Sequence, residues 1–237
     1  MSSFTDAQYL LYDAGEQLKA IEKFYAESIQ EQNISPALNL KVKHYVEDLR
    51  SCLEYVAHHI HFVFCQGNEF PFKTQFPIFE HEDKMIRKMV ADRTAPFKEL
   101  PVNKPELWDY LLSLQTFRNP ETASWLYILQ DLSNSSKHRK LSPQRKQIDM
   151  FARHLEFPGI TFKNCTFRGV KNNIQINGVN YDPTVENGLS SVALVEDVDA
   201  WVSFVFEELN IPVFPTLQDI LQGVASVVDQ IEEYLNE

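Results

Sequence analysis

The sequence predicts an α+β fold that is mostly helical: a bundle of long helices, then a small antiparallel β unit, then a closing helix. Two long stretches with apolar residues at three- and four-residue steps open the chain and predict an N-terminal helix hairpin. After Pro143 the apolar period shifts towards two, which favours strands, and residues 216–235 return to the helical period. We therefore expect a helical bundle over 1–142 and, packed on it in one compact domain, a β unit with the C-terminal helix over 143–237.

The helices can be placed from their caps and breaks. The first is expected over residues 5–32 with Thr5 as its N-cap, and the second from Pro36 to about Cys65. Because only a short break separates them, they should pair antiparallel. A loop rich in Gly, Pro and Phe is expected over 66–79. The shorter helices that follow are expected at 81–92, at 105–117 with Asn103 as its N-cap, and at 121–137.

The strands are expected where β-branched and aromatic residues alternate with polar ones, at 159–170, 172–182 and 201–208. Asn177–Gly178 is a strong signal for a two-residue hairpin turn, between strands at 174–176 and 179–181.

Composition bounds the class of protein. The chain has 237 residues, 44% of them hydrophobic, which is enough for a substantial core. No apolar run approaches the roughly 20 residues of a membrane-spanning helix, and the first residues carry no basic leader, so we expect a cytoplasmic protein with no membrane partner. The three cysteines are odd in number and lack CxxC spacing, which disfavours a disulfide framework and a zinc knuckle. No glycine-rich phosphate loop, GxSxG or HExxH motif is present, so no cofactor or metal is expected.

Charge is distributed unevenly along the chain. The net charge is −11, yet residues 137–171 hold nine Lys and Arg against two acids. After Lys171 there are twelve acids and no basic residue. Either these basic and acidic segments neutralise each other across an internal contact or a dimer, or the basic segment is a patch for an anionic partner.

A first candidate site lies on the second helix, where Arg50, Glu54 and His61 fall on one flank of the apolar stripe. Arg50 and Glu54 are an i,i+4 pair, which by itself indicates an ordinary salt bridge. The functional alternative is an acid–base cluster in which Glu54 raises the pKa of His58 or His61. His58 and His61 alone are too few for a metal site.

A second candidate site lies where the helix ending near Lys137 passes into a polar and basic cluster. Asp131, Asn134 and His138 share one flank of that helix, next to its apolar face. The cations Lys137, His138 and Arg139 also suit a helix C-terminus, whose carbonyls and dipole favour positive charge. The cluster is therefore either a compensated helix end or a site with His138 as acid or base.

Four segments carry a resemblance to a known family. They are LRSCLEYVAHHI, the FPIF loop at 76–79, an LxxLQxF segment and WLYILQDLSNSSKHRKL. Together they resemble a family of uncharacterised bacterial and phage-associated helical proteins with a Lys-His-Arg signature, over about Val46 to Leu235. The resemblance implies a helical fold with closing strands and a C-terminal helix, and it implies no particular activity.

A more distant resemblance is to HEPN-type helical domains, many of which are dimeric ribonucleases with an Arg-x4–6-His motif on a helix. Here seven residues separate Arg50 from His58. Asn134-x3-His138 matches the second half of an Arg-Asn-x3-His pattern, with Ser133 in the place of the arginine.

Two functions follow as expectations. The first is a helical domain that acts through dimerisation or through an RNA or protein partner, with the basic segment Lys137–Lys146 as its contact surface. The alternative, implied by the HEPN resemblance, is a metal-independent ribonuclease. Its residues would be His138 as general acid or base, Arg139 and Lys137 on the phosphate, and Asn134 and Asp131 orienting His138.

Overall fold

A computed structural model describes residues 3–31, 33–65, 74–121, 124–138, 144–170, 174–176, 179–181, 193 and 195–236. Within these ranges the chain forms two compact units: residues 1–23, 36–142 and 214–237 make the first, and residues 24–35 and 143–213 make the second. The predicted class is confirmed, because the fold is α+β and mostly helical, with a long N-terminal helix pair, a small antiparallel sheet and a closing helix.

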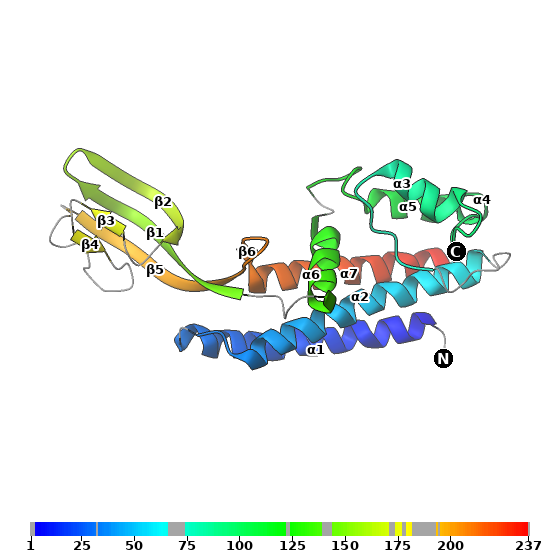
Figure 1. The fold of residues 1–237 in the computed structure, drawn as a ribbon, viewed down its shortest axis with the longest axis horizontal. Coiled ribbons are helices and arrows are strands. Elements are labelled where there is room, and N and C mark those ends of the chain that lie inside the picture. Colours follow the sequence, from blue (N-terminus) through cyan, green and yellow to red (C-terminus); the bar gives the residue numbers. More distant parts are fainter. Residues whose placement is uncertain are drawn as a thin grey trace. The chain divides into compact units, whose positions relative to one another are not determined.

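Three long helices form the centre of the first unit (Figure 1). They are α1 (Ser3–Gln30), α2 (Pro36–Phe64) and α7 (Val213–Asn236). The Cys52 Sγ of α2 donates to the Ala7 carbonyl of α1 at 3.2 Å, and the Tyr45 hydroxyl of α2 donates to the Leu217 carbonyl of α7 at 2.8 Å. The apolar positions that face inwards are fully buried, for example Leu49 and Val224. Each such aliphatic side chain contributes about 1.5–3 kcal/mol to stability through burial.

The long helices confirm the sequence prediction closely. Pro36 is the first residue of α2, as its fixed φ favours. Thr5 is not an N-cap, because α1 begins two residues earlier and includes Thr5 in its first turn.

Shorter helices cover one side of the bundle. They are α3 (Glu82–Ile86), the π-helix η2 (Arg87–Ala91) that continues it, α4 (Leu100–Asn103), α5 (Pro105–Ser113) and α6 (Ser124–His138). The predicted N-cap Asn103 is wrong: Lys104 occupies that position, and the Asn103 side chain donates to the Phe64 carbonyl at the end of α2 at 2.7 Å. The helix α6 packs against α2. Among the described helices, none is long and apolar enough to cross a membrane.

The second unit contains a four-stranded antiparallel sheet in the order β2-β1-β5-β6. Its strands are β1 (Gln144–Phe157), β2 (Ile160–Val170), β5 (Val195–Phe206) and β6 (Ile211–Pro212). The predicted hairpin strands β3 (Ile174–Ile176) and β4 (Val179–Tyr181) pair antiparallel, and the predicted turn Asn177–Gly178 lies outside the described residues. Tyr25 of α1 belongs to this unit, and its hydroxyl accepts from the Phe204 amide at 3.2 Å.

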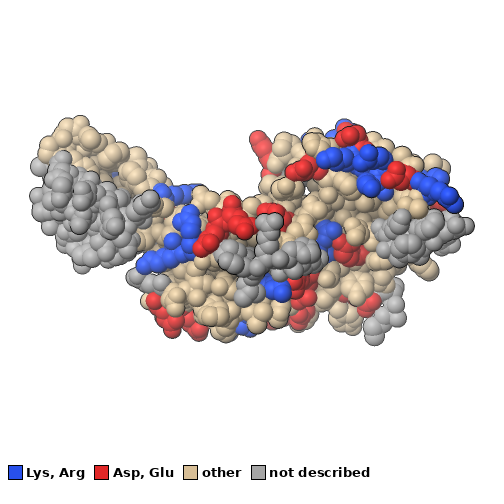
Figure 2. Space-filling model, viewed as in Figure 1, with Lys and Arg blue, Asp and Glu red and all other residues tan. Residues whose placement is uncertain are grey.

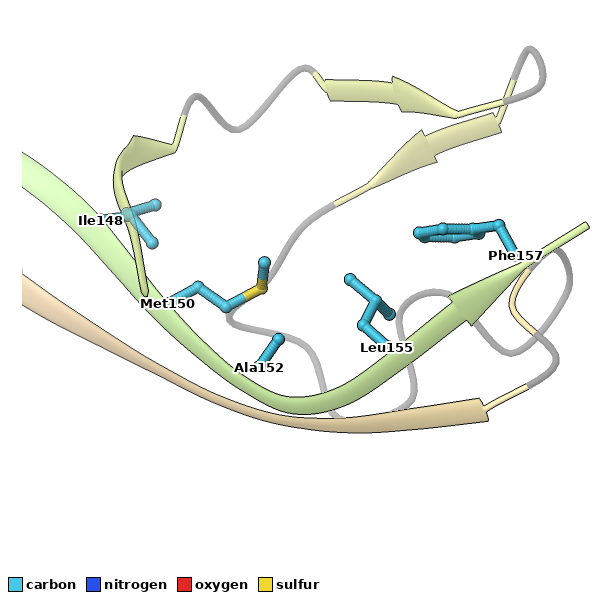
Figure 3. Packing of buried hydrophobic residues seen from close by; sticks show 5 residues of the cluster. All are labelled: Ile148, Met150, Ala152, Leu155 and Phe157. Atoms are coloured by element: carbon cyan, nitrogen blue, oxygen red, sulfur yellow. The ribbon is translucent and has the colours of Figure 1, made fainter. Parts of the chain in front are cut away.

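The central strand β1 was not among the predicted strands. Its buried side chains follow alternation at Ile148, Met150 and Ala152, then change phase and continue at Leu155 and Phe157. Figure 3 shows all five on the same side of the strand. The phase changes because the pairing of β1 with β5 shifts register between Ala152 and His154, so β1 carries an extra residue there. This bulge hides the period of two from a reading of the sequence.

A buried carboxylate ties the sheet together at a second bulge. Asp149 accepts hydrogen bonds from the Gln147 amide at 2.8 Å, the Gly169 backbone N–H at 3.0 Å and the Ser203 hydroxyl at 2.8 Å. Gly169 has a φ of 67°, which a residue with a side chain rarely adopts. Because these donors come from β1, β2 and β5, Asp149 links three neighbouring strands through one side chain.

Candidate functional site

The first candidate site begins with the predicted pair on α2. Arg50 Nη2 lies 2.5 Å from Glu54 Oε1, and the two side chains are 14% and 29% exposed. The other Glu54 oxygen accepts the backbone N–H of Phe76 at 2.8 Å. Phe76 belongs to the FPIF loop, which has no regular structure and whose backbone needs partners from elsewhere. Glu54 therefore attaches this loop to α2.

Burial dominates the electrostatics of this pair. It lowers the pKa of the Arg50 guanidinium, and the neighbouring Glu54 carboxylate works in the opposite direction. Arg50 Nη1 is buried and has no hydrogen-bond partner among the described residues. A guanidinium stays charged in proteins, so Arg50 depends on Glu54 for compensation in a site that water hardly reaches.

His61 is part of a different contact. It is 6% exposed, and its Nδ1 lies 2.8 Å from the Pro96 carbonyl. A carbonyl only accepts, so Nδ1 carries the hydrogen in this contact. His58, one turn earlier, is exposed. The structure thus brings Arg50 and Glu54 together, ties His61 to the segment after η2, and leaves His58 in solvent.

The second candidate site is placed by α6. Gly223 of α7 lies so close to the Trp125 ring of α6 that a Cβ there would stand 2.3 Å from ring carbons. Asp131 is half-buried and Asn134 is exposed. Lys137 and His138 form the last turn of α6, with side chains outside the described set, and Arg139 and Lys140 lie outside the described residues.

Gln115 is a loop anchor that the sequence patterns did not single out. Its side chain is 1% exposed; it accepts from the Phe79 N–H at 2.9 Å and donates to the Pro77 carbonyl at 3.0 Å. Gln115 and Glu54 thus hold the FPIF loop from two sides. The signal in the sequence was a glutamine in the leucine-rich run LLSLQTF, where a large polar side chain that becomes buried needs partners.

The cysteines of the first unit do not suit nucleophilic chemistry. Burial raises the pKa of the Cys52 thiol to about 12 and that of the Cys65 thiol to about 11. The reactive form of cysteine is the thiolate, which neither would populate near neutral pH. Within the described ranges, no three His, Cys, Asp or Glu side chains are arranged to hold a metal ion.

Part of the charge asymmetry is compensated inside the second unit. The Arg153 guanidinium of β1 pairs with Asp197 at 2.7 Å and with Asp199, both on the neighbouring strand β5. Arg153 holds the pKa of Asp199 below its usual range. The basic and acidic segments therefore meet across β1 and β5, and this ion pair agrees with internal neutralisation.

The protein is therefore an α+β, mostly helical protein. The polar side chains of Glu54 and His61 on α2 bind backbone groups of two neighbouring loops. Protein-family models, curated proteins and solved structures were all compared with the chain, and none of them matches it.

Proposed function

We propose that this protein acts by binding, through a second copy of itself or an anionic partner, and that the segment Lys137–Lys146 is the contact surface. One observation argues against catalysis at the α2 groups and so favours binding. Glu54 is engaged with Arg50 and the Phe76 N–H, and His61 with the Pro96 carbonyl. A general base must be able to reach a substrate proton, and these groups would first have to leave contacts that hold the fold.

The first residues of the basic segment, Lys137 and His138, belong to helix α6, which is packed on the bundle. The helix α6 buries Leu126, Leu129 and Leu132 and lies against Gly223 through Trp125. Residues in the last turn of a packed helix, here Lys137 and His138, lose less backbone conformational entropy on binding than residues on a free loop. At the other end of the segment, Arg145 is exposed on β1, and its guanidinium donates to Asn210.

The overall charge limits how such a surface works. A chain with net charge −11 repels polyanions at long range, so attraction by the basic segment acts within about a Debye length, 8–10 Å at physiological salt. Binding should therefore weaken strongly as salt rises.

Sedimentation velocity of the purified protein, together with incubation with total RNA in EDTA, tests the proposal. We expect a concentration-dependent dimer, weakened when Lys137, Arg139 and Lys140 are changed to Gln, and no RNA cleavage. Cleavage that disappears in His138→Ala would replace the binding function with the metal-independent ribonuclease. A strictly monomeric protein that ignores RNA at low salt would contradict the choice of this surface.

A further inference from the structure

A second basic surface, separate from Lys137–Lys146, lies on the segment from Lys84 to Lys98. This stretch holds five basic residues and a single acid, Asp92, in a chain with net charge −11. On the face drawn in Figure 2, basic atoms gather over the part of the bundle that carries α3 and the segment after it, with a few acidic atoms beside them. We call the five residues the α3 ridge; they are Lys84, Arg87, Lys88, Arg93 and Lys98, and all are exposed.

Within the described part of the chain, no acidic side chain pairs with the ridge cations. Among the described residues, none of the five side chains forms an ion pair or hydrogen bond. Two of the nearby acids are engaged elsewhere: Glu82 pairs with Arg118, and Glu80 accepts the Tyr127 hydroxyl at 2.8 Å. Asp83 next to Lys84 and Asp92 between Lys88 and Arg93 form no ion pair among the described residues, so they offset part of the positive charge. Exposed cations at close spacing repel one another, so five of them without internal partners leave a surface that an external anion would stabilise.

The backbone holds these cations in fixed places. Lys84, Arg87 and Lys88 stand at i, i+3 and i+4, so they share one side of α3 and η2. Met85 and Met89 on the other side are buried and fix the helix on the bundle. The helix ends in a π-turn, a rare geometry that is frequent at functional sites, with the Asp92 N–H donating to the Arg87 carbonyl at 2.8 Å.

His61 helps to fix the segment that carries Arg93 and Lys98. The chain folds back after η2, and the Phe97 N–H donates to the Met89 carbonyl at 2.8 Å. His61 of α2 binds the Pro96 carbonyl of the same turn. Arg93 and Lys98 flank this anchored turn and are exposed.

The composition of the ridge selects the kind of partner. An anionic membrane surface would need several exposed apolar side chains to insert, but the methionines of this amphipathic segment face the protein and Ile86, 41% exposed, is its single exposed large apolar side chain. A protein partner would usually need an aromatic or aliphatic centre of several residues, which Ile86 alone does not supply. A phosphate backbone is bound mainly by cations. We infer that the α3 ridge binds the phosphodiester backbone of a single-stranded nucleic acid, whose flexible chain can follow an irregular row of charges.

The test is fluorescence anisotropy of a labelled single-stranded RNA, with the full-length protein at several salt concentrations. Five phosphate contacts predict a slope of log affinity against log salt of about −3.5, or roughly a 100-fold loss between 50 and 200 mM. The variant Arg87→Gln/Lys88→Gln should reduce the slope to about −2. The matched control Lys19→Gln/Lys23→Gln changes the net charge equally on exposed positions of α1 and should leave the slope unchanged.

Further binding measurements distinguish RNA from DNA, from membranes and from the Lys137–Lys146 surface. Single-stranded DNA of equal length should bind as RNA does if the backbone alone is recognised, whereas a tenfold preference for RNA would add a contact to the 2′-hydroxyl. The ridge inference is overturned if neither strand binds at low salt, if only anionic vesicles bind, or if the ridge and control variants lose affinity equally. Loss in Arg145→Gln/Lys146→Gln instead of the ridge variant would also overturn it, and would support the Lys137–Lys146 surface of the proposed function.

Discussion

Two glycines on long helices predict opposite effects of the same substitution. Gly223 lies in α7 and Gly15 in α1, so replacement by alanine should gain about 1 kcal/mol of helix propensity at either position. A Cβ at Gly15 would meet nothing within 4 Å, whereas a Cβ at Gly223 would stand 2.3 Å from Cδ2 and Cε2 of Trp125. Atoms cannot approach so closely, so α6 or the rigid indole ring must shift.

The magnitudes follow from these distances. Gly15→Ala should raise the free energy of unfolding by about 0.5–1 kcal/mol. Overpacking in a well-packed contact costs about 1–3 kcal/mol, and the clash at Gly223 belongs at the upper end because ring carbons cannot rotate away. After the gain in propensity, Gly223→Ala should lower the free energy of unfolding by about 2 kcal/mol. The two variants should therefore differ by about 3 kcal/mol.

Urea unfolding followed by circular dichroism measures both values, and equal slopes with denaturant would show that the unfolded states are comparable. A double-mutant cycle isolates the cause: with Trp125→Leu in place, Gly223→Ala should become neutral or stabilising. The reasoning is refuted if Gly223→Ala stabilises the protein as much as Gly15→Ala does, or if Trp125→Leu leaves its effect unchanged.

Three further predictions concern the Arg50–Glu54 pair and the cysteines. Glu54→Leu should lower the free energy of unfolding by about 3–5 kcal/mol, because it leaves the buried Arg50 charge and the Phe76 N–H without partners. Arg50→Leu should cost less, because Glu54 still accepts the Phe76 N–H. Urea unfolding that finds Arg50→Leu the more destabilising variant would contradict this. At pH 8, iodoacetamide should label Cys165 and spare Cys52 and Cys65 in the folded protein, as peptide mass spectrometry would show. Burial raises the thiol pKa from about 9 to about 12 for Cys52 and to about 11 for Cys65. The free energy of unfolding should therefore fall as the pH rises above 9, where only the thiols of the unfolded chain ionise. A free energy of unfolding that rises above pH 9 would show that burial does not raise these pKa values.

The long helices were predictable because each buries one continuous stripe, and a stripe on a helix leaves a period of three to four residues in the sequence. The strand β1 was not, because its extra residue near Arg153 shifts the apolar alternation by one position and cancels the period of two. Asn103 shows a similar limit: its position before Pro105 suits an N-cap, yet its amide binds the Phe64 carbonyl on another helix.

In the candidate site too, contacts along one helix could be predicted and contacts between distant segments could not. The Arg50–Glu54 pair could be predicted, since residues four apart on a helix are neighbours whatever the rest of the fold does. The engagement of Glu54 with Phe76 and of His61 with Pro96 could not, because each joins groups more than twenty residues apart along the chain.

By itself the sequence determined the class of fold, the order of the long elements and the local pairs along each helix, all of which depend on neighbours within a few residues. Only the tertiary structure decided what those polar groups do. A buried donor or acceptor must find a partner wherever the folded chain supplies one, and here Glu54, His61 and Gln115 each bind at least one backbone group of a segment without regular structure. The polar groups of α2, for which the sequence allowed either an ordinary salt bridge or an acid–base cluster, anchor loops in the folded chain.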